Sequence, residues 1–273
     1  MKKILVPIDF SPCSGNALKY ALYLASRTGS EITTLHVIFP NDGINNNMYD
    51  AFWIDEYIEQ RNKDLKDWTD RHVAECGFTN IKTDIICNVG FPVSTIGETA
   101  AALHAALIVM GTTGATGLKG IFLGSTAGGV IVNTEVPVFT VPPDTVFKTV
   151  QQFVLATDFN FKINVKSHQV LSMLLKAHES KLNILHILPE NATPQVEQEK
   201  KISEKLHGID HYFHYIHDKD VVNAIDNYIE STNSGVLAGV AHHHSLFHNL
   251  FSKSISRTLA GRVQIPMLVL HDA

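Results

Sequence analysis

The chain has 273 residues, of which 45% are hydrophobic and 18% are charged, and its formal net charge is -5. This composition is typical of a soluble globular protein with sizeable apolar cores and excludes a mostly disordered chain. A mildly acidic chain without a cluster of lysine or arginine offers no surface for a phosphate backbone, so we expect no nucleic-acid partner.

The first residues run directly into a short apolar strand that contains Pro7 and ends at Asp9. This apolar stretch is too short for a signal peptide, and no other stretch reaches the ~20 apolar residues of a membrane span. The three cysteines lack metal-type spacing, which fits a reducing compartment better than a set of disulfides. We therefore expect a cytoplasmic protein that does not contact a membrane.

Short β-branched strands alternate with amphipathic helical stretches through the first half of the chain. This alternation predicts a doubly wound α/β domain, with a parallel sheet and helices on both of its faces. Ser11 followed by Pro12 predicts the start of the first helix, because the hydroxyl caps free amides and proline tolerates the first helical position. The expected strands are 3–8, 31–37, 81–87, 107–110 and 138–141.

A glycine-rich segment follows the most apolar of these strands and extends from Gly111 to Thr126. Glycines at such a position let backbone amides approach an anion closely. Gly124 and Ser125 would present amides and a hydroxyl at the start of a helix, where phosphate binds favourably. Because ligands of open parallel sheets bind outside the carboxyl ends of the strands, the segment predicts a phosphate site.

The spacing of this segment, Gly111, two residues, Gly114, nine residues, then Gly124-Ser125, resembles the nucleotide-binding motif of the universal stress protein family, in its ATP-binding branch. The resemblance covers all of the first half and, more weakly, all of the second. Other marks of the family occur in the same order, namely a strand ending at Asp9, then Leu35-His36-Val37, Gly90-Phe91-Pro92 and Val136-Pro137-Val138.

The resemblance implies an α/β fold of two tandem doubly wound domains, each a five-stranded parallel sheet flanked by about four helices, of the adenine nucleotide alpha hydrolase-like kind. It also implies that the first domain binds ATP, together with Mg²⁺. Asp9 and Val37 would lie at the adenine, Gly111 would face the ribose and phosphates, and Ser125 would hold the phosphates. The implied site comprises Pro7, Ile8, Asp9, Val37, Met110, Gly111, Thr112, Gly114, Gly124, Ser125 and Thr126.

The second half of the chain repeats the first at lower similarity. Segments 153–160, 183–188 and 265–270 correspond to 4–11, 33–38 and 136–141, and the offset falls from about 150 residues to 129. We expect the missing residues to lie after the second strand, where 189–207 replaces 41–76. The first helix of this half is expected at 161–178, and the two domains are expected at 1–144 and 150–273.

The second half lacks the phosphate motif. In its equivalent segment, 235–254, we expect Gly239 to be the surviving glycine, and Lys253 stands where Gly124 stood. The sequence His217-Asp218-Lys219-Asp220 replaces Gly-Phe-Pro. We therefore predict that this half does not bind ATP in the same way, although Asp158 is retained.

Twelve of the fifteen histidines follow Gln151. Imidazole binds zinc, copper and nickel, and His242, His243 and His244 lie on the expected loop after the fourth strand of this half. The spacing matches no standard zinc pattern. Two interpretations therefore stay open, a metal or ligand site and a polar loop that fills space.

These observations predict an ATP-binding regulatory protein of the stress response, in which occupancy of the first half changes its interface with the second half or with another chain. The resemblance implies that the two halves pair as an intramolecular pseudo-dimer, and that two chains can then form a homodimer. The alternative is a scaffold or carrier that uses a histidine-lined pocket of the second half. We expect no enzyme beyond slow ATP hydrolysis or self-phosphorylation, because a Walker lysine and a nucleophile elbow are absent.

Overall fold

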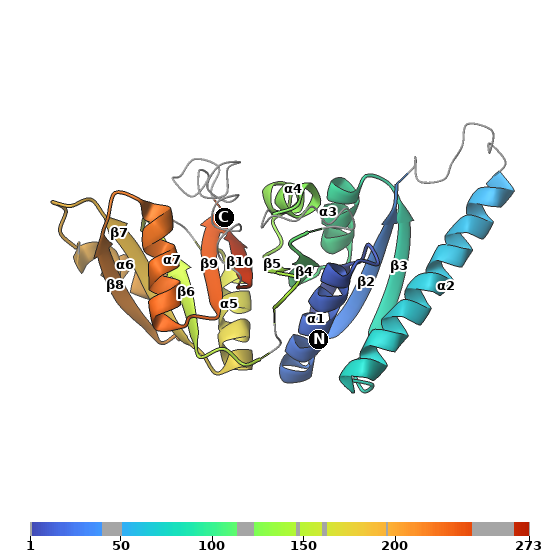
Figure 1. Cartoon of the computed structure of the whole chain (residues 1–273), viewed down its shortest axis with the longest axis horizontal. Helices are drawn as coiled ribbons and strands as arrows, with labels where there is room; N and C mark the ends of the chain where they lie inside the picture. The colour runs from blue at the N-terminus through green and yellow to red at the C-terminus, as the bar shows by residue number, and fades with distance from the viewer. Residues whose placement is uncertain are drawn as a thin grey trace.

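The computed structural model describes residues 2–39, 51–113, 123–145, 148–159, 163–194, 196–241 and 265–272, with the backbone alone for 51–54. Within these residues one sheet runs in the order β3-β2-β1-β4-β5-β10-β9-β6-β7-β8. All of its neighbouring strands are parallel except β5 and β10, which pair antiparallel at the centre. Two five-stranded parallel sheets are therefore fused edge to edge (Figure 1).

The first half supplies strands β1 to β5 and helices α1 to α4. The strands are β1 Lys3–Pro7, β2 Glu31–Ile38, β3 Thr83–Val89, β4 Leu107–Gly111 and β5 Val138–Val141. The helices are α1 Pro12–Thr28, α2 Ala51–Cys76, α3 Pro92–Ala102 and α4 Ser125–Asn133. The expected strands are confirmed with end shifts of one or two residues.

The second half repeats this order with a shorter middle. Its strands are β6 Gln152–Ala156, β7 Lys181–Leu188, β8 His211–His217, β9 Val236–Ala241 and β10 Met267–His271. Its described helices are α5 Val165–His178, α6 Val196–Lys205 and α7 Val221–Thr232. Helix α6 has 10 residues where α2 has 26, which confirms the expected position of the missing residues.

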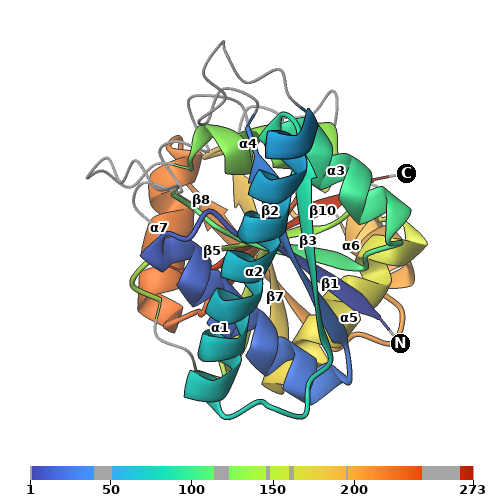
Figure 2. The same ribbon diagram turned by 90° about the vertical axis from the view of Figure 1, so that its right-hand side faces the viewer.

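Helices cover both faces of the sheet, as the end view in Figure 2 shows. Alternate residues of β1 point to opposite faces, because strand side chains alternate. Ile4 and Val6 join the apolar cluster under α1, whereas Leu5 joins the cluster under α3 and α4. Strands buried on both faces need nearly continuous apolar sequence, which explains the very apolar runs in β1 and β4.

Helix α1 starts and ends where its sequence predicts. The Ser14 amide donates to the Ser11 hydroxyl at 3.1 Å, Pro12 occupies the first helical position, and Gly29 ends the helix in the left-handed region with φ 66°. Helix α5, in contrast, starts one turn later than the expected residue 161. Its cap is Asn164, whose side chain accepts from the Ser167 amide at 2.7 Å.

Among the described helices, none combines the length and the apolar character that crossing a bilayer requires.

Candidate functional site

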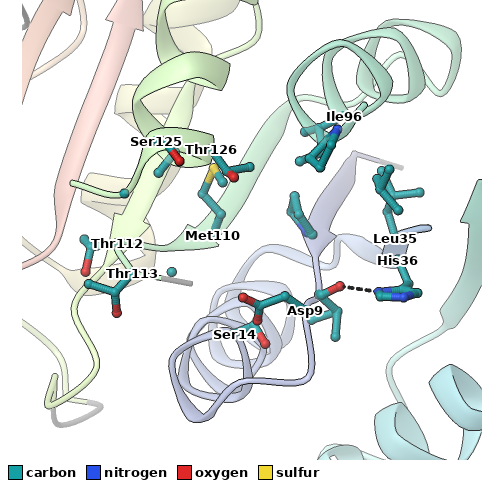
Figure 3. A pocket seen from close by; sticks show the side chains of 17 residues that line it. Asp9, Ser14, Leu35, His36, Ile96, Met110, Thr112, Thr113, Ser125 and Thr126 are labelled. Carbon is teal, nitrogen blue, oxygen red and sulfur yellow. Dashed lines mark hydrogen bonds between the residues drawn. The ribbon is translucent and has the colours of Figure 1, made fainter. Parts of the chain in front are cut away.

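A cavity of about 370 Å³ opens at the carboxyl ends of β1, β2 and β4 (Figure 3). Strands β1 and β4 are neighbours in the sheet although β2 and β3 come between them in the chain, so the strand order reverses here, at the switch point where open α/β sheets hold ligands. Gly114 lies outside the described residues. All other residues that the family resemblance implied line the cavity, namely Pro7, Ile8, Asp9, Val37, Met110, Gly111, Thr112, Gly124, Ser125 and Thr126.

One end of the cavity is an apolar slot. Ile8, Leu35, Met110 and Ile96 line it and are each at most 5% exposed. A flat aromatic group fits such a slot because apolar contact is its main requirement. Leu35 and Ile96 were not among the residues expected from the sequence, although Leu35 stands on the same face of β2 as Val37 and Ile96 follows Gly90-Phe91-Pro92 by about one helical turn.

The other end of the cavity is lined by hydroxyl groups and by the start of a helix. Thr112 and Thr113 follow β4, and Ser125 and Thr126 begin α4. Gly124 caps α4 without a side-chain hydrogen bond, so the cap residue itself leaves the first amides of the helix to another acceptor, such as an anion. None of the described lining residues is a lysine or arginine, so amide dipoles, hydroxyls and a bound cation would have to balance phosphate charge.

Backbone hydrogen bonds connect Gly124, the cap of α4, with the residues at the ends of β4 and β5. The Gly124 amide donates to the Thr112 carbonyl at 2.6 Å, and the Thr112 amide donates to the Val141 carbonyl at 3.1 Å. The start of α4 is therefore tied to the end of β4, and through it to the end of β5. A ligand held at Ser125 would contact a position that the sheet itself fixes.

Gly111 is required by a close approach between β4 and α1. A Cβ atom at this position would lie 2.6 Å from Cys13 Sγ and 3.2 Å from the Cys13 backbone. Any side chain would therefore require Cys13, in the first turn of α1, to shift. The Cys13 thiol donates to the Val141 carbonyl at 3.6 Å, which holds the first turn of α1 against the same strand ends.

Asp9 is an exposed carboxylate at the mouth of the cavity, beside Ser14 on the first turn of α1. It accepts a hydrogen bond from the Ser11 amide at 3.0 Å. A carboxylate in this position can accept from an amine or hydroxyl of a ligand, or bind a divalent cation. Ser14 adds a hydroxyl to the cavity wall beside Asp9. It was also not among the residues expected from the sequence.

The turn after β1 carries a strained backbone that a histidine supports. Phe10 has φ 62°, which is uncommon for a bulky residue. His36 Nδ1 lies 2.8 Å from the Ile8 carbonyl, a bond that Figure 3 draws as a dashed line, and its ring lies 4.7 Å from that of Phe10. These contacts fix the backbone that presents Ile8 and Asp9 to the cavity.

The sequence profile of the Universal stress protein family matches residues 1–142. The chain belongs to this family. Universal stress protein MJ0531 of Methanocaldococcus jannaschii is 35% identical over 144 residues, which cover 51% of this chain and 81% of that protein. Universal stress protein Sll1388 of Synechocystis is 27% identical over 149 residues, which cover 51% of this chain and 96% of that protein.

A universal stress protein from Archaeoglobus fulgidus has a similar fold over 99% of this chain and 98% of its own. The TM-score is 0.74 at 22% sequence identity. The doubled fold is therefore shared with a solved member of the family. The profile match, in contrast, covers the half of this universal stress protein that contains the cavity.

Backbone register shows how the second half of this universal stress protein departs from the first. Leu107 pairs with Ile4, and Val236 pairs with Phe153 at the corresponding place. Counting along β9 then makes Val240 the equivalent of Gly111, and Gly239 the equivalent of Met110. Gly239 is therefore not the surviving motif glycine, which corrects the expectation from the sequence. The later start of α5 removes the helical turn that Cys13 occupies in the first half.

The histidines of β8 are held by other protein groups. Along β8, His211 Nε2 lies 2.8 Å from Ser203 Oγ, His214 Nε2 lies 3.3 Å from Asn183 Oδ1, and His217 Nε2 lies 2.9 Å from the Ala192 carbonyl. No group of histidine, cysteine and carboxylate side chains suited to a metal occurs among the described residues. His242, His243, His244 and Lys253 lie outside them.

Proposed function

We propose that this universal stress protein is a nucleotide-responsive regulatory protein whose first half binds ATP together with Mg²⁺. The observation that supports this most strongly is the convergence of three features on one cavity of about 370 Å³. These features are an apolar slot, a glycine that permits close backbone approach, and a helix start without a side-chain cap. Together they suit a flat base joined to an anionic chain.

Each part of the cavity has a role in this proposal. The adenine ring occupies the slot beside Ile8 and Val37, and Asp9 accepts a hydrogen bond at the base or the ribose. The phosphates contact the amides and hydroxyls of Ser125 and Thr126. Mg²⁺ neutralises part of the phosphate charge, which the described lining residues do not balance with a lysine or arginine.

The cavity suits binding better than turnover. Asp9 and His36 are the titratable side chains among its described lining residues, and His36 Nδ1 is occupied by the Ile8 carbonyl. A general base positioned at Ser125 is not found among them. We therefore propose regulation through occupancy, with ATP hydrolysis or self-phosphorylation at most a slow side reaction.

We also propose that residues 1–144 form the nucleotide-binding domain and residues 150–273 a partner domain, in a cytoplasmic protein. Val240 supports this division of roles. In the second half it stands at the position of Gly111, where the first half requires a glycine because Cys13 lies so close. No observation on the described residues favours the alternative carrier function at the histidines of the second half.

Calorimetric titration of ATP with Mg²⁺ into nucleotide-free protein tests this proposal. We expect one binding event per chain in the wild type. In Gly111→Ala the new Cβ would meet Cys13 Sγ at 2.6 Å, and we expect the affinity to fall by at least about tenfold. Gly97→Ala is the matched control, because its Cβ would meet only the Asn133 carbonyl, at 3.6 Å, outside the cavity.

No heat in the wild type, with no adenine released from the purified protein on denaturation, would remove the proposal. Equal affinity in Gly111→Ala and Gly97→Ala would place the nucleotide elsewhere. A metal analysis of the same nucleotide-free sample addresses the metal-carrier form of the alternative, which requires a stoichiometric metal.

A further inference from the structure

One face of helix α1 contacts Gly111 of the cavity wall, the linker between the halves and the second half in turn. Its residues are spaced three or four positions apart, so they share a face of the helix. Figure 1 shows α1 on the side of the first half that is nearer to the second half. The residues of this face are Cys13, Asn16, Tyr20, Tyr23 and Arg27.

The first turn of α1 belongs to the cavity wall. Ser14 lines the cavity, and Cys13 packs against Gly111 so closely that a Cβ there would not fit. Cys13 also donates to the carbonyl of Val141, the last residue of β5. The position of this turn is therefore defined by the strand ends that surround the proposed ligand.

The next residue of the face, Asn16, holds the start of the linker. Its Nδ2 group donates to the carbonyls of Pro142, Pro143 and Thr145 at 2.9, 3.2 and 3.2 Å. The Thr145 amide donates to the Pro142 carbonyl at 3.2 Å, so these residues form a turn closed on itself. One side-chain amide thus fixes the segment through which the chain leaves the first half.

Further along the face, α1 meets helix α5 of the second half. Tyr20 Oη lies 3.3 Å from His178 Nε2, and both residues are 2% exposed. Arg27 forms an ion pair with Glu179 at 3.1 Å. His178 also receives the linker, because the Val150 amide donates to His178 Nδ1 at 3.3 Å. Helix α1 therefore contacts the start of the linker directly and its end through His178.

We propose that α1 transmits occupancy of the cavity to the linker and the second half, and that Asn16 is the positioning residue of this coupling. The inference rests on the proposed nucleotide site. A ligand that contacts the first turn of α1 favours the arrangement in which this turn packs on Gly111. Because a helix moves as a unit, the same arrangement keeps Asn16 on the linker carbonyls and Tyr20 on His178.

Hydrogen exchange of the linker amides, measured with and without ATP and Mg²⁺, tests the coupling. In the wild type we expect ATP to slow exchange at Thr145 and Val150 by at least about fivefold. In Asn16→Ala we expect this protection to disappear at Thr145, while calorimetry still shows one bound ATP per chain. Asn62→Ala is the matched control, because its Nδ2 donates to the Ile58 carbonyl within α2, away from the cavity.

The outcomes separate this inference from the proposed function. No calorimetric binding to the wild type would remove the nucleotide site and the coupling together. Binding that leaves linker exchange unchanged in the wild type, or equal protection in wild type and Asn16→Ala, would overturn the coupling alone. If Asn16→Ala does not fold, Asn16→Asp keeps the size of the side chain and removes its donors, and the same loss of protection is expected.

Discussion

His178 is a buried histidine at the contact between the two halves. Burial, and secondly the charge of Arg27, lowers the pKa of its imidazole from 6.5 to about 4. Between these two values the unfolded chain binds a proton that the folded chain does not bind. Acidification therefore destabilises the fold across this interval, whereas above the unfolded pKa the group contributes nothing to the pH dependence.

We predict that this histidine alone lowers the free energy of unfolding by about 3 kcal/mol as the pH falls from 6.5 to about 4. Urea unfolding at a series of pH values measures the slope. His178→Gln keeps polar groups without a titrating one and should show a shallower slope. Equal slopes in the two proteins would contradict the prediction.

Asp9 offers a second test at the scale of a single residue. In Asp9→Asn the side-chain oxygen can still accept from the Ser11 amide, so the turn should persist. If the carboxylate accepts from the base or ribose, AMP and ATP should lose affinity by the same factor, about tenfold or more. Calorimetry with both nucleotides measures the two factors.

The comparison of the two nucleotides identifies what Asp9 binds. A loss confined to ATP with Mg²⁺ would indicate that Asp9 binds the cation instead of the base or ribose. Asp67→Asn removes the same charge from an exposed position on α2 and should change neither affinity.

At the scale of elements, the start of α5 shows where a repeat in the sequence can mislead. The similarity of 153–160 to 4–11 predicted a helix near residue 161, but the cap that the structure forms is Asn164. The side chain of Asn164 also donates to the Asp272 carbonyl after β10, at 3.4 Å. The residue that caps α5 thus also makes a long-range contact, which the local sequence does not predict.

We predict that Asn164→Ala lowers the free energy of unfolding by about 1 kcal/mol, the usual cost of removing a helix cap. Asn191→Ala, in the turn after β7, should cost less than about 0.5 kcal/mol. Urea unfolding at neutral pH compares the two variants. Equal costs would indicate that Asn164 does not determine where α5 starts.

The elements that the sequence predicted well are those defined by local pattern. Apolar β-branched runs located the strands of the first half within two residues. The glycine spacing and the strand ends identified most of the cavity wall. Leu35, Ile96 and Ser14 were missed because they reach the cavity through strand pairing and helix packing. Gly239 was misassigned, although the offset of 129 residues that places Lys253 at Gly124 also places Val240 at Gly111, in agreement with the register of β9 against β6.

At the scale of the whole molecule, the antiparallel pair of β5 and β10 joins two half-sheets into one. Leu268 of β10 pairs with Phe139 of β5, and both side chains are 0% exposed. Local sequence gives no information on pairing between strands about 130 residues apart. The consequence is a shared core, so the two halves should unfold together and not as independent units.

Leu268→Ala tests this cooperativity, because the substitution lies in the second half while Trp53 and Trp68 both belong to the first. A buried leucine replaced by alanine costs about 2–5 kcal/mol. We expect tryptophan fluorescence and far-ultraviolet circular dichroism to give the same, equally shifted urea midpoint. Val221→Ala, at a partly exposed side chain of α7, should shift neither probe measurably. A dichroism transition that precedes the fluorescence transition would show that the second half unfolds alone, and that the central strand pair does not couple the halves.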